Sequence, residues 1–144
     1  METLHATCVA LEEGAVLLTG PSGCGKSDLA LRLIDNGGGL VADDRTVLAA
    51  DQGGLWGSAP ELLAGLLEVR GIGIIRLPVV ASARVRVLIA LGGPDNERLP
   101  ETLDEEDIHG VTLPRFVLNG FHASAPAKVH LALRLATGLV ERTE

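Results

Sequence analysis

The residues best suited to chemistry in this chain form a glycine-rich run that ends in a lysine and a serine. The run reads Gly20-Pro21-Ser22-Gly23-Cys24-Gly25-Lys26-Ser27, and it fits G-x-x-x-x-G-K-[ST], the pattern of a phosphate-binding loop. Gly23 and Gly25 can adopt backbone angles that are closed to other residues, so successive N–H groups can point into one concavity. Lys26 is suited to the β- and γ-phosphates of a nucleoside triphosphate, and the Ser27 hydroxyl is suited to Mg²⁺. The run therefore predicts a phosphate-binding site.

Two adjacent carboxylates, Asp43 and Asp44, follow the short apolar run of residues 40–42. A phosphoryl-transfer enzyme needs one carboxylate to hold Mg²⁺ or its water, and another to accept the proton of an attacking hydroxyl. Neighbouring residues of a strand point to opposite faces, so the two aspartates cannot both reach the same atom. We therefore expect them to divide these two roles. The alternative is an acidic turn that follows a buried strand.

Glu68 and Arg70 belong to a β-branched run that Gly71 and Gly73 interrupt. The glycines predict a bulge or a close approach of another backbone. On an extended segment, Glu68 and Arg70 share one face. They could serve as a metal ligand and a phosphate clamp, or form a structural ion pair, and the residue types alone leave both readings open.

Two isolated residues are further candidates. His5 lies near the start of an expected strand, where a lone histidine is more often simply exposed than part of a site. Arg98 is the only cation among residues 94–110, a polar and acidic stretch that reads as a loop or lid. It could move onto a phosphate, and the alternative is a solvated arginine.

The elements around the glycine-rich run should position it between a strand and a helix. Residues 15–19 are apolar and of strand length, and residues 29–34 repeat apolar positions at helical spacing. A strand, a glycine loop and a helix N-terminus together form an anion site. Residues 5–10 predict a strand that pairs with residues 15–19 in a hairpin, and the helix should end at the glycines 37–39.

The rest of the chain predicts a mixture of hairpins and helices. Residues 46–50 and 55–57 read as a hairpin, and residues 58–61 as a capping box that starts a short helix through Leu67. Residues 84–91 read as a strand, and residues 111–118 as an edge strand because Pro114 cannot donate to a ladder. A final helix should run from Ser124 to about Val140.

The composition of the chain excludes several classes of protein. The chain has 144 residues, 47% of them hydrophobic, and a net charge of −7, which fits one folded domain and argues against binding to nucleic acid or an anionic membrane. Two cysteines are too few for a disulfide framework. No apolar run approaches the ~18 residues of a membrane helix, so we expect a cytoplasmic protein.

Three motifs, in this order, resemble the catalytic domain of HPr kinase/phosphorylase. The phosphate loop matches the family form G-x-S-G-x-G-K-S, and residues 40–45 (Leu-Val-Ala-Asp-Asp-Arg) match its aspartate-pair strand. Residues 66–75 (Leu-Leu-Glu-Val-Arg-Gly-Ile-Gly-Ile-Ile) match the family signature almost letter for letter. The first motif occurs in many unrelated proteins, whereas the third is highly specific. The resemblance covers residues 5–91 well and the remainder loosely.

The resemblance implies an α/β P-loop domain with a mixed central sheet, similar to the fold of phosphoenolpyruvate carboxykinase. It implies a cytoplasmic enzyme that uses ATP and Mg²⁺ to phosphorylate a regulatory serine of HPr, a carrier protein of the phosphotransferase system. Many members also remove that phosphate by phosphorolysis. In this reading Asp44 is the base for the acceptor serine, and in phosphorolysis it returns the proton.

The resemblance also implies roles for other candidates. Asp43 and Glu68 would help to hold the metal together with Ser27. His5 matches the family's active-site histidine, and Arg98 resembles a family arginine that precedes a leucine near the reaction centre.

Two departures from the family pattern bear on assembly and on the reverse reaction. Full-length members carry an N-terminal domain and form hexamers, whereas this chain reads as a single catalytic domain over residues 1–144, similar to the short forms of α-proteobacteria, which act mainly as kinases. A family segment that contacts the partner and is tied to phosphorolysis is not kept in residues 113–120. The residues therefore leave open whether phosphorolysis and the hexamer are retained.

Two other functions fit the same phosphate chemistry. One is a small-molecule kinase or NTPase, and the other is a non-enzymatic module in which a bound nucleotide only sets the conformation. No adenine-recognition residue is identifiable in the sequence, so the preference for ATP rests on the resemblance, as does the identity of the partner.

Overall fold

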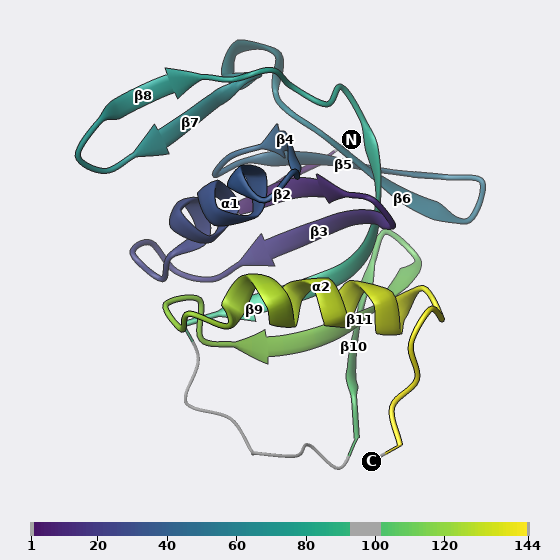
Figure 1. Cartoon of the computed structure of the whole chain (residues 1–144). Coiled ribbons are helices and arrows are strands. Elements are labelled where there is room, and N and C mark those ends of the chain that lie inside the picture. The colour runs from purple at the N-terminus through teal and green to yellow at the C-terminus, as the bar shows by residue number, and fades with distance from the viewer. Residues whose placement is uncertain (1, 93–101, 144) are drawn as a thin grey trace.

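One large mixed sheet organises the protein. A computed structural model describes residues 2–92 and 102–143, and the sheet runs in the order β1-β5-β6-β9-β3-β2-β4, with β11 pairing with β9 and β10 with β11 (Figure 1). The pairs β3–β9 and β9–β11 are parallel and the others are antiparallel. The strands are β1 (Glu2–Leu4), β2 (Ala6–Leu11), β3 (Gly14–Thr19), β4 (Gly39–Ala42), β5 (Thr46–Asp51), β6 (Gly54–Ser58), β9 (Ala83–Leu91), β10 (Asp104–Ile108) and β11 (Val111–Leu118). The expected α/β fold with a mixed central sheet is confirmed.

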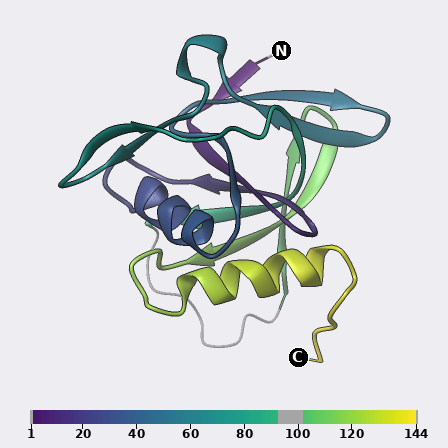
Figure 2. The same ribbon diagram turned by 45° about the horizontal axis from the view of Figure 1, so that its top comes forward.

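The two faces of the sheet bury two separate sets of side chains, because strand residues alternate in direction. In β3, Val16 and Leu18 face the core that helices α1 (Lys26–Asp35) and α2 (Ala125–Ala136) cover. Ala15 and Leu17 face the opposite core, to which β5, β6 and β11 contribute Leu48, Leu55 and Leu113. Figure 2 shows both helices on the same side of the sheet. The sheet curls, so its strands close the second core without a helix.

A separate two-stranded hairpin, β7 (Leu66–Val69) with β8 (Gly73–Arg76), projects beside the main sheet (Figure 1). The predicted helix through Leu67 is wrong: only the 3-10 turn η1 (Glu61–Leu63) forms. Leu67 instead pairs with Ile75, and its side chain is fully buried, so tertiary burial overrides the local helix signal. Gly71 provides the turn of this hairpin with φ of 87°, and no atom lies within 4 Å of an added Cβ, so the expected bulge or close approach is also wrong.

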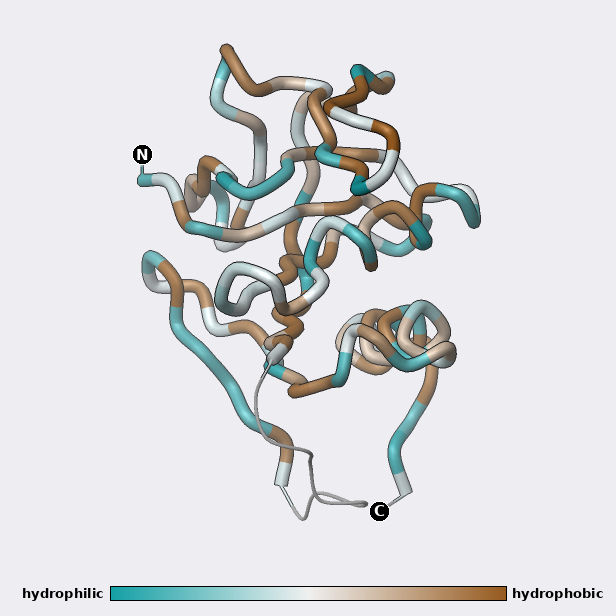
Figure 3. Tube along the Cα trace, turned by 90° about the vertical axis from the view of Figure 1, so that its left-hand side faces the viewer, coloured by the Kyte–Doolittle hydropathy of each residue, from teal (hydrophilic) through white to brown (hydrophobic). Residues whose placement is uncertain are grey.

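The region before α2 differs from the loop and edge strand that the sequence predicted. The acidic residues of β10 form a strand that pairs with β11, and this strand is hydrophilic over residues 104–107, before Ile108 (Figure 3). β11 is not an edge strand, because it lies between β9 and β10. Pro114 nevertheless meets only Glu105 of β10, and pairing with β9 begins at Arg115, where backbone donors are available again.

The last helix ends earlier than its apolar pattern predicted. α2 stops at Ala136, because Gly138 adopts a left-handed φ of 79° and its N–H bonds the carbonyl of Leu135. The next residue, Leu139, bonds back to Arg134 through its backbone N–H, which completes a common helix stop. Leu139 is consequently 65% exposed instead of packed on the sheet.

The register of the strands brings several strand ends to one edge of the sheet. The end of β3 pairs with the start of β2 (Thr19 with Ala6), and the end of β4 lies beside Cys8. The ends of β9 and β11 also coincide there, at Leu91 and Leu118. Ligands commonly bind outside the carboxyl ends of strands in α/β sheets. Loops that are far apart in the sequence therefore meet at this edge.

Candidate active site

The phosphate loop connects β3 to α1, and glycines are required in it for two different reasons. Gly23 and Gly25 have φ of 83° and 96°, in the left-handed region, and Gly25 is the N-cap of α1. At Gly20 the reason is space, because an added Cβ would lie 2.5 Å from the carbonyl oxygen of Leu91 and 2.7 Å from Sγ of Cys24. The end of β9 therefore packs directly under the loop.

Lys26, in the first turn of α1, holds its ammonium group over the loop. Its side chain is buried, and Nζ donates to the carbonyl oxygens of Gly20 and Pro21 at 2.7 and 3.2 Å. A buried ammonium is costly unless hydrogen bonds satisfy it, and these carbonyls do so. The loop thus carries a positive charge at a defined place, as binding of a polyphosphate requires.

Asp43 follows β4 and accepts hydrogen bonds from three different elements. Its Oδ1 accepts from the hydroxyls of Thr7 (2.9 Å) and Ser27 (2.8 Å), and its Oδ2 accepts from the backbone N–H of Glu68 (3.3 Å). This carboxylate therefore ties together β2, the start of α1 and the β7–β8 hairpin. It lies directly beside the hydroxyl of the phosphate-loop serine.

Asp44 makes different contacts from its neighbour. Its backbone has a left-handed φ of 64°, and its carboxylate is 63% exposed. Oδ1 of Asp44 accepts from Nε2 of His5 at 2.6 Å, and its backbone N–H donates to Oγ1 of Thr7 at 3.2 Å. Asp43 is thus held inside a hydrogen-bond network, whereas Asp44 is oriented by one histidine and faces solvent.

Thr7 is a site residue that sequence reasoning missed. It is fully buried on β2, donates to Asp43 and accepts from the backbone of Asp44. The available signal was a hydroxyl inside the otherwise apolar residues 6–9. Its neighbour Cys8 is fully buried, and this burial raises the pKa of the Cys8 thiol to about 12.

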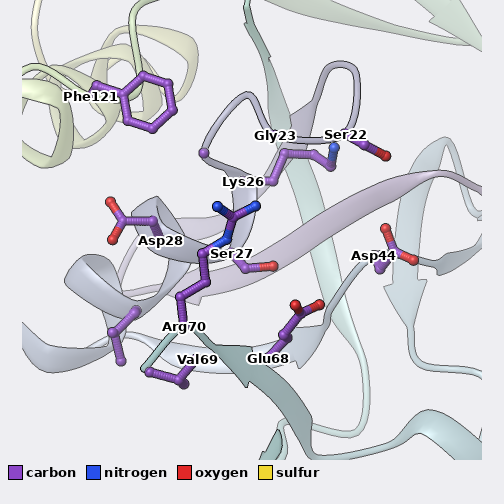
Figure 4. Close-up of a pocket in the computed structure, with 12 residues that line it drawn as sticks. Ser22, Gly23, Lys26, Ser27, Asp28, Asp44, Glu68, Val69, Arg70 and Phe121 are labelled. Carbon is purple, nitrogen blue, oxygen red and sulfur yellow. The ribbon is translucent and has the colours of Figure 1, made fainter. Parts of the chain in front are cut away.

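These elements enclose an open pocket of about 550 Å³ (Figure 4). The pocket is lined by Ser22, Gly23, Gly25, Lys26, Ser27, Asp28, Leu31, Asp44, Glu68, Val69, Arg70 and Phe121. Figure 4 shows the side chains of Glu68 and Arg70 pointing from the hairpin toward the phosphate loop. No ion pair joins Glu68 and Arg70, and both residues line the pocket. Leu31 and Phe121 were not foreseen as site residues.

Most of the predicted site residues come together here. His5 contacts Asp44, and Asp43 contacts Ser27. Cys24 is 6% exposed and packs inward, as a variable position of the loop allows. Arg98 lies outside the described residues.

Arg115 is not part of this group. It pairs with Asp104 and Glu106 of β10, at 3.1 and 3.8 Å.

The oxygen donors of the site fit a hard cation that arrives with phosphates. Among residues 2–92 and 102–143, no group of three or more His, Cys, Asp or Glu side chains is placed to hold a metal by itself. Mg²⁺ is usually bound by one or two carboxylates together with substrate phosphates. Ser27, Asp43 and Glu68 supply hydroxyl and carboxylate oxygens of that kind beside the loop. In the described part of the chain, neither helix is long and apolar enough to cross a membrane.

Fold and pocket together define a class: an α/β phosphate-loop domain with carboxylates at the edge of its phosphate site. Residues 1–122 match the family model described as "HPr Serine kinase C-terminal domain", and the chain belongs to this family. The expected resemblance is confirmed.

Relatives and a solved structure agree with this assignment. The chain is 40% identical over 125 residues to the HPr kinase/phosphorylase of Streptococcus thermophilus, and 38% identical over 126 residues to that of Limosilactobacillus reuteri. These alignments cover 78% and 79% of this chain but only 40% and 39% of the relatives. The chain therefore spans about 40% of the length of the curated relatives that it matches.

The structure of the Hpr(Ser) kinase/phosphatase from Coxiella burnetii superimposes with a TM-score of 0.81 at 31% identity. That comparison covers 93% of this chain and 95% of the other. The shared fold thus extends over nearly the whole chain.

Proposed function

We propose that the protein is an ATP- and Mg²⁺-dependent protein kinase that phosphorylates a serine of HPr. The observation that carries this proposal is the position of Asp44, an exposed carboxylate held by His5 at the edge of a phosphate-loop pocket. An exposed base can meet a hydroxyl on the surface of another protein. Family membership supplies the identity of that protein, because the relatives are named HPr kinase/phosphorylase.

In the proposed reaction, the chain's residues position one phosphoryl group and move one proton. The loop N–H groups and Lys26 bind the phosphates of ATP and orient the γ-phosphoryl group. The carboxylate of Asp44 accepts the proton of the serine hydroxyl while the serine oxygen bonds to the γ-phosphorus and the bond to the β,γ-bridging oxygen breaks. ADP leaves, and phosphoserine remains on the partner.

His5 is a positioning residue in this proposal. It donates to Oδ1 of Asp44 and so leaves Oδ2 available to the incoming hydroxyl. Ser27, Asp43 and Glu68 would hold Mg²⁺, which neutralises charge that develops on the phosphate oxygens. Arg98, which resembles a family arginine that precedes a leucine, is proposed as a phosphate contact in the reaction.

The reverse reaction is a second candidate because relatives are named kinase/phosphorylase and kinase/phosphatase. In phosphorolysis, inorganic phosphate would take the phosphoryl group from phosphoserine, giving pyrophosphate. Protonated Asp44 would then return its proton to the serine oxygen.

The proposal also includes a cytoplasmic location, a single catalytic domain over residues 1–144, and a homo-oligomer, for which the family suggests a hexamer.

The decisive experiment incubates the protein with Mg-ATP and HPr, and maps the modified residue by mass spectrometry. We expect one phosphate on a serine of HPr, and transfer that is slower by about 10²- to 10⁴-fold with the Asp44→Asn variant. ATP turnover that HPr does not change would instead indicate a small-molecule kinase or an NTPase. Binding of ATP with neither turnover nor transfer would indicate a nucleotide sensor.

A further inference from the structure

One aromatic side chain, Phe121, lies exposed in the pocket beside the phosphate loop. The chain has only one Trp, two Phe and no Tyr, yet the side chain of Phe121 is 65% exposed and lines the pocket. Its ring lies next to Gly25, since an added Cβ there would be 3.1 Å from Cε1 of Phe121. A ring that stays mostly in water adds little to folding stability. Its surface is therefore available to a ligand.

The segment that carries Phe121 is held in place from both sides. Arg32 of α1 donates to the carbonyl oxygens of Gly120 and His122, the residues that flank Phe121. The backbone N–H of Phe121 donates to Oδ1 of Asn119 at 2.9 Å. These bonds fix the backbone of Phe121 relative to the helix that begins at the phosphate loop. A ring held in this way loses less freedom when a ligand binds.

The pocket has two distinct ends. Figure 4 shows Phe121 and Asp44 far apart, with Lys26 and Ser27 between them. A nucleoside triphosphate also has two ends, the reacting γ-phosphate and the base. If the γ-phosphate meets the acceptor at Asp44, a nucleotide that extends across the loop places its base toward Phe121.

We propose that Phe121 is the stacking platform for the base of the nucleotide, an inference that rests on the proposed use of a nucleoside triphosphate in this pocket. The other apolar residues that line the pocket are Leu31 and Val69. Among the described lining residues there is no Asn or Gln, the amides that pair with the edge of adenine. Stacking accepts any base because every base has a π-face. The site therefore binds ATP and GTP with similar affinity.

Isothermal titration with ATP, GTP and inorganic triphosphate, each with Mg²⁺, tests this assignment. We expect Phe121→Ala to weaken ATP and GTP to a similar extent, by about 5- to 150-fold, the range of one base stacked on an aromatic ring. Inorganic triphosphate has no base, so its affinity should stay within about twofold. Phe121→Trp should retain the affinity for both nucleotides.

The matched control is Trp56→Ala, which removes the other exposed aromatic side chain, 40% exposed and outside the pocket lining. It should leave all three affinities unchanged, and thermal melting of each variant checks folding. Unchanged ATP affinity in Phe121→Ala overturns the inference, as does an equal loss for inorganic triphosphate, which would mean that the ring only supports the loop. A wild-type protein that binds none of the three overturns the proposed function as well. Selective loss of nucleotide affinity without any phosphate transfer to HPr would overturn the proposed kinase and leave the base platform standing.

Discussion

The two walls of the pocket are built in opposite ways. The first, which we call the sheet wall, consists of the phosphate loop and Asp43 with its partners at the edge of the main sheet. Its polar groups are buried or already hydrogen-bonded, as in Thr7, Ser27 and Lys26. The second, the hairpin wall, is the β7–β8 hairpin, which carries Glu68 and Arg70. The hairpin pairs with no strand of the main sheet.

The difference shows how one pocket can combine preorganisation with access. Ile72 and Ile74 of the hairpin wall are 75% and 71% exposed, and Leu67 is the one fully buried side chain among residues 66–76, so few buried contacts hold this hairpin. Segments with few buried contacts open at lower free energy than the core. The bond from Glu68 N–H to Asp43 joins the two walls directly. The sheet wall thus sets the geometry of the reaction, and the hairpin wall brings charged groups to it from the solvent side.

The largest expected effect follows from removing the proposed general base, Asp44, which lies next to Asp43 of the sheet wall. Asp44→Asn keeps the size of the side chain but cannot accept the serine proton, so kcat should fall by about 10²- to 10⁴-fold. Nucleotide affinity, measured by titration calorimetry, should change little because Asp44 is exposed and is not part of the phosphate loop. A variant that transfers phosphate at the normal rate would show that another group takes the proton.

A substitution in the hairpin wall should weaken Mg²⁺ binding without changing the stability of the fold. Glu68→Gln removes an exposed carboxylate, and we expect the Mg²⁺ concentration needed for half-maximal activity to rise by about 10- to 100-fold. The melting temperature should be unchanged, because surface substitutions away from buried groups have small effects. Glu61→Gln, on the exposed turn η1, is a control that should change neither quantity. A large fall in melting temperature for Glu68→Gln would contradict the contrast between the walls.

A substitution in the sheet wall should, in contrast, lower the stability of the protein together with its activity. Thr7→Val keeps the shape of the side chain but removes one of the three donors to Asp43 and the acceptor of the Asp44 N–H. This should cost about 1–3 kcal/mol in the free energy of unfolding. Chemical denaturation measures the loss, and activity should fall with it because both aspartates lose their positions. Thr7→Ser restores the hydroxyl and should recover most of the activity, which a purely steric role of Thr7 would not allow.

The smallest expected effect is on stability, and it comes from an ion pair outside both walls. Nε of Arg134 lies 3.0 Å from Oε2 of Glu13. Burial acts to raise the pKa of Glu13, but the hydrogen bond and charge of Arg134, with a contribution from His130, outweigh it and hold that pKa below its ordinary value of 4.5. The pair therefore stabilises the folded protein above about pH 4.5, and this contribution is lost as the pH falls through the lowered pKa.

Melting curves of the wild type and of Glu13→Gln measure this contribution. The two proteins should differ by less than about 1 kcal/mol at pH 7, and the difference should vanish in acid. A difference that persists at low pH would mean that packing, and not charge, holds the turn before β3 to α2.

Local sequence patterns correctly predicted the helices and strands whose own residues show a clear periodicity or motif. The strand–loop–helix unit around residues 20–27, the strand before Asp43 and the strand of residues 84–91 all form as expected. The errors fall where distant packing competes with a local signal. Leu66 and Leu67 follow a helix start but form a strand, because Leu67 is buried in the core and pairs with β8. The acidic β10 reads as a loop, yet β11 provides it with a pairing partner.

Local sequence patterns were enough to predict a phosphate loop, two adjacent carboxylates and a specific signature around Glu68. Those residue types at those spacings have few other uses. The folded chain was needed to show which aspartate is enclosed and which faces solvent, that Thr7 hydrogen-bonds to both aspartates, and that Phe121 lines the pocket. Beyond the β2–β3 hairpin, the pairings that bring these strand ends to one edge of the sheet join β9 to β3 and β11, and β2 to β4, and no local pattern encodes pairings between segments so far apart in the chain.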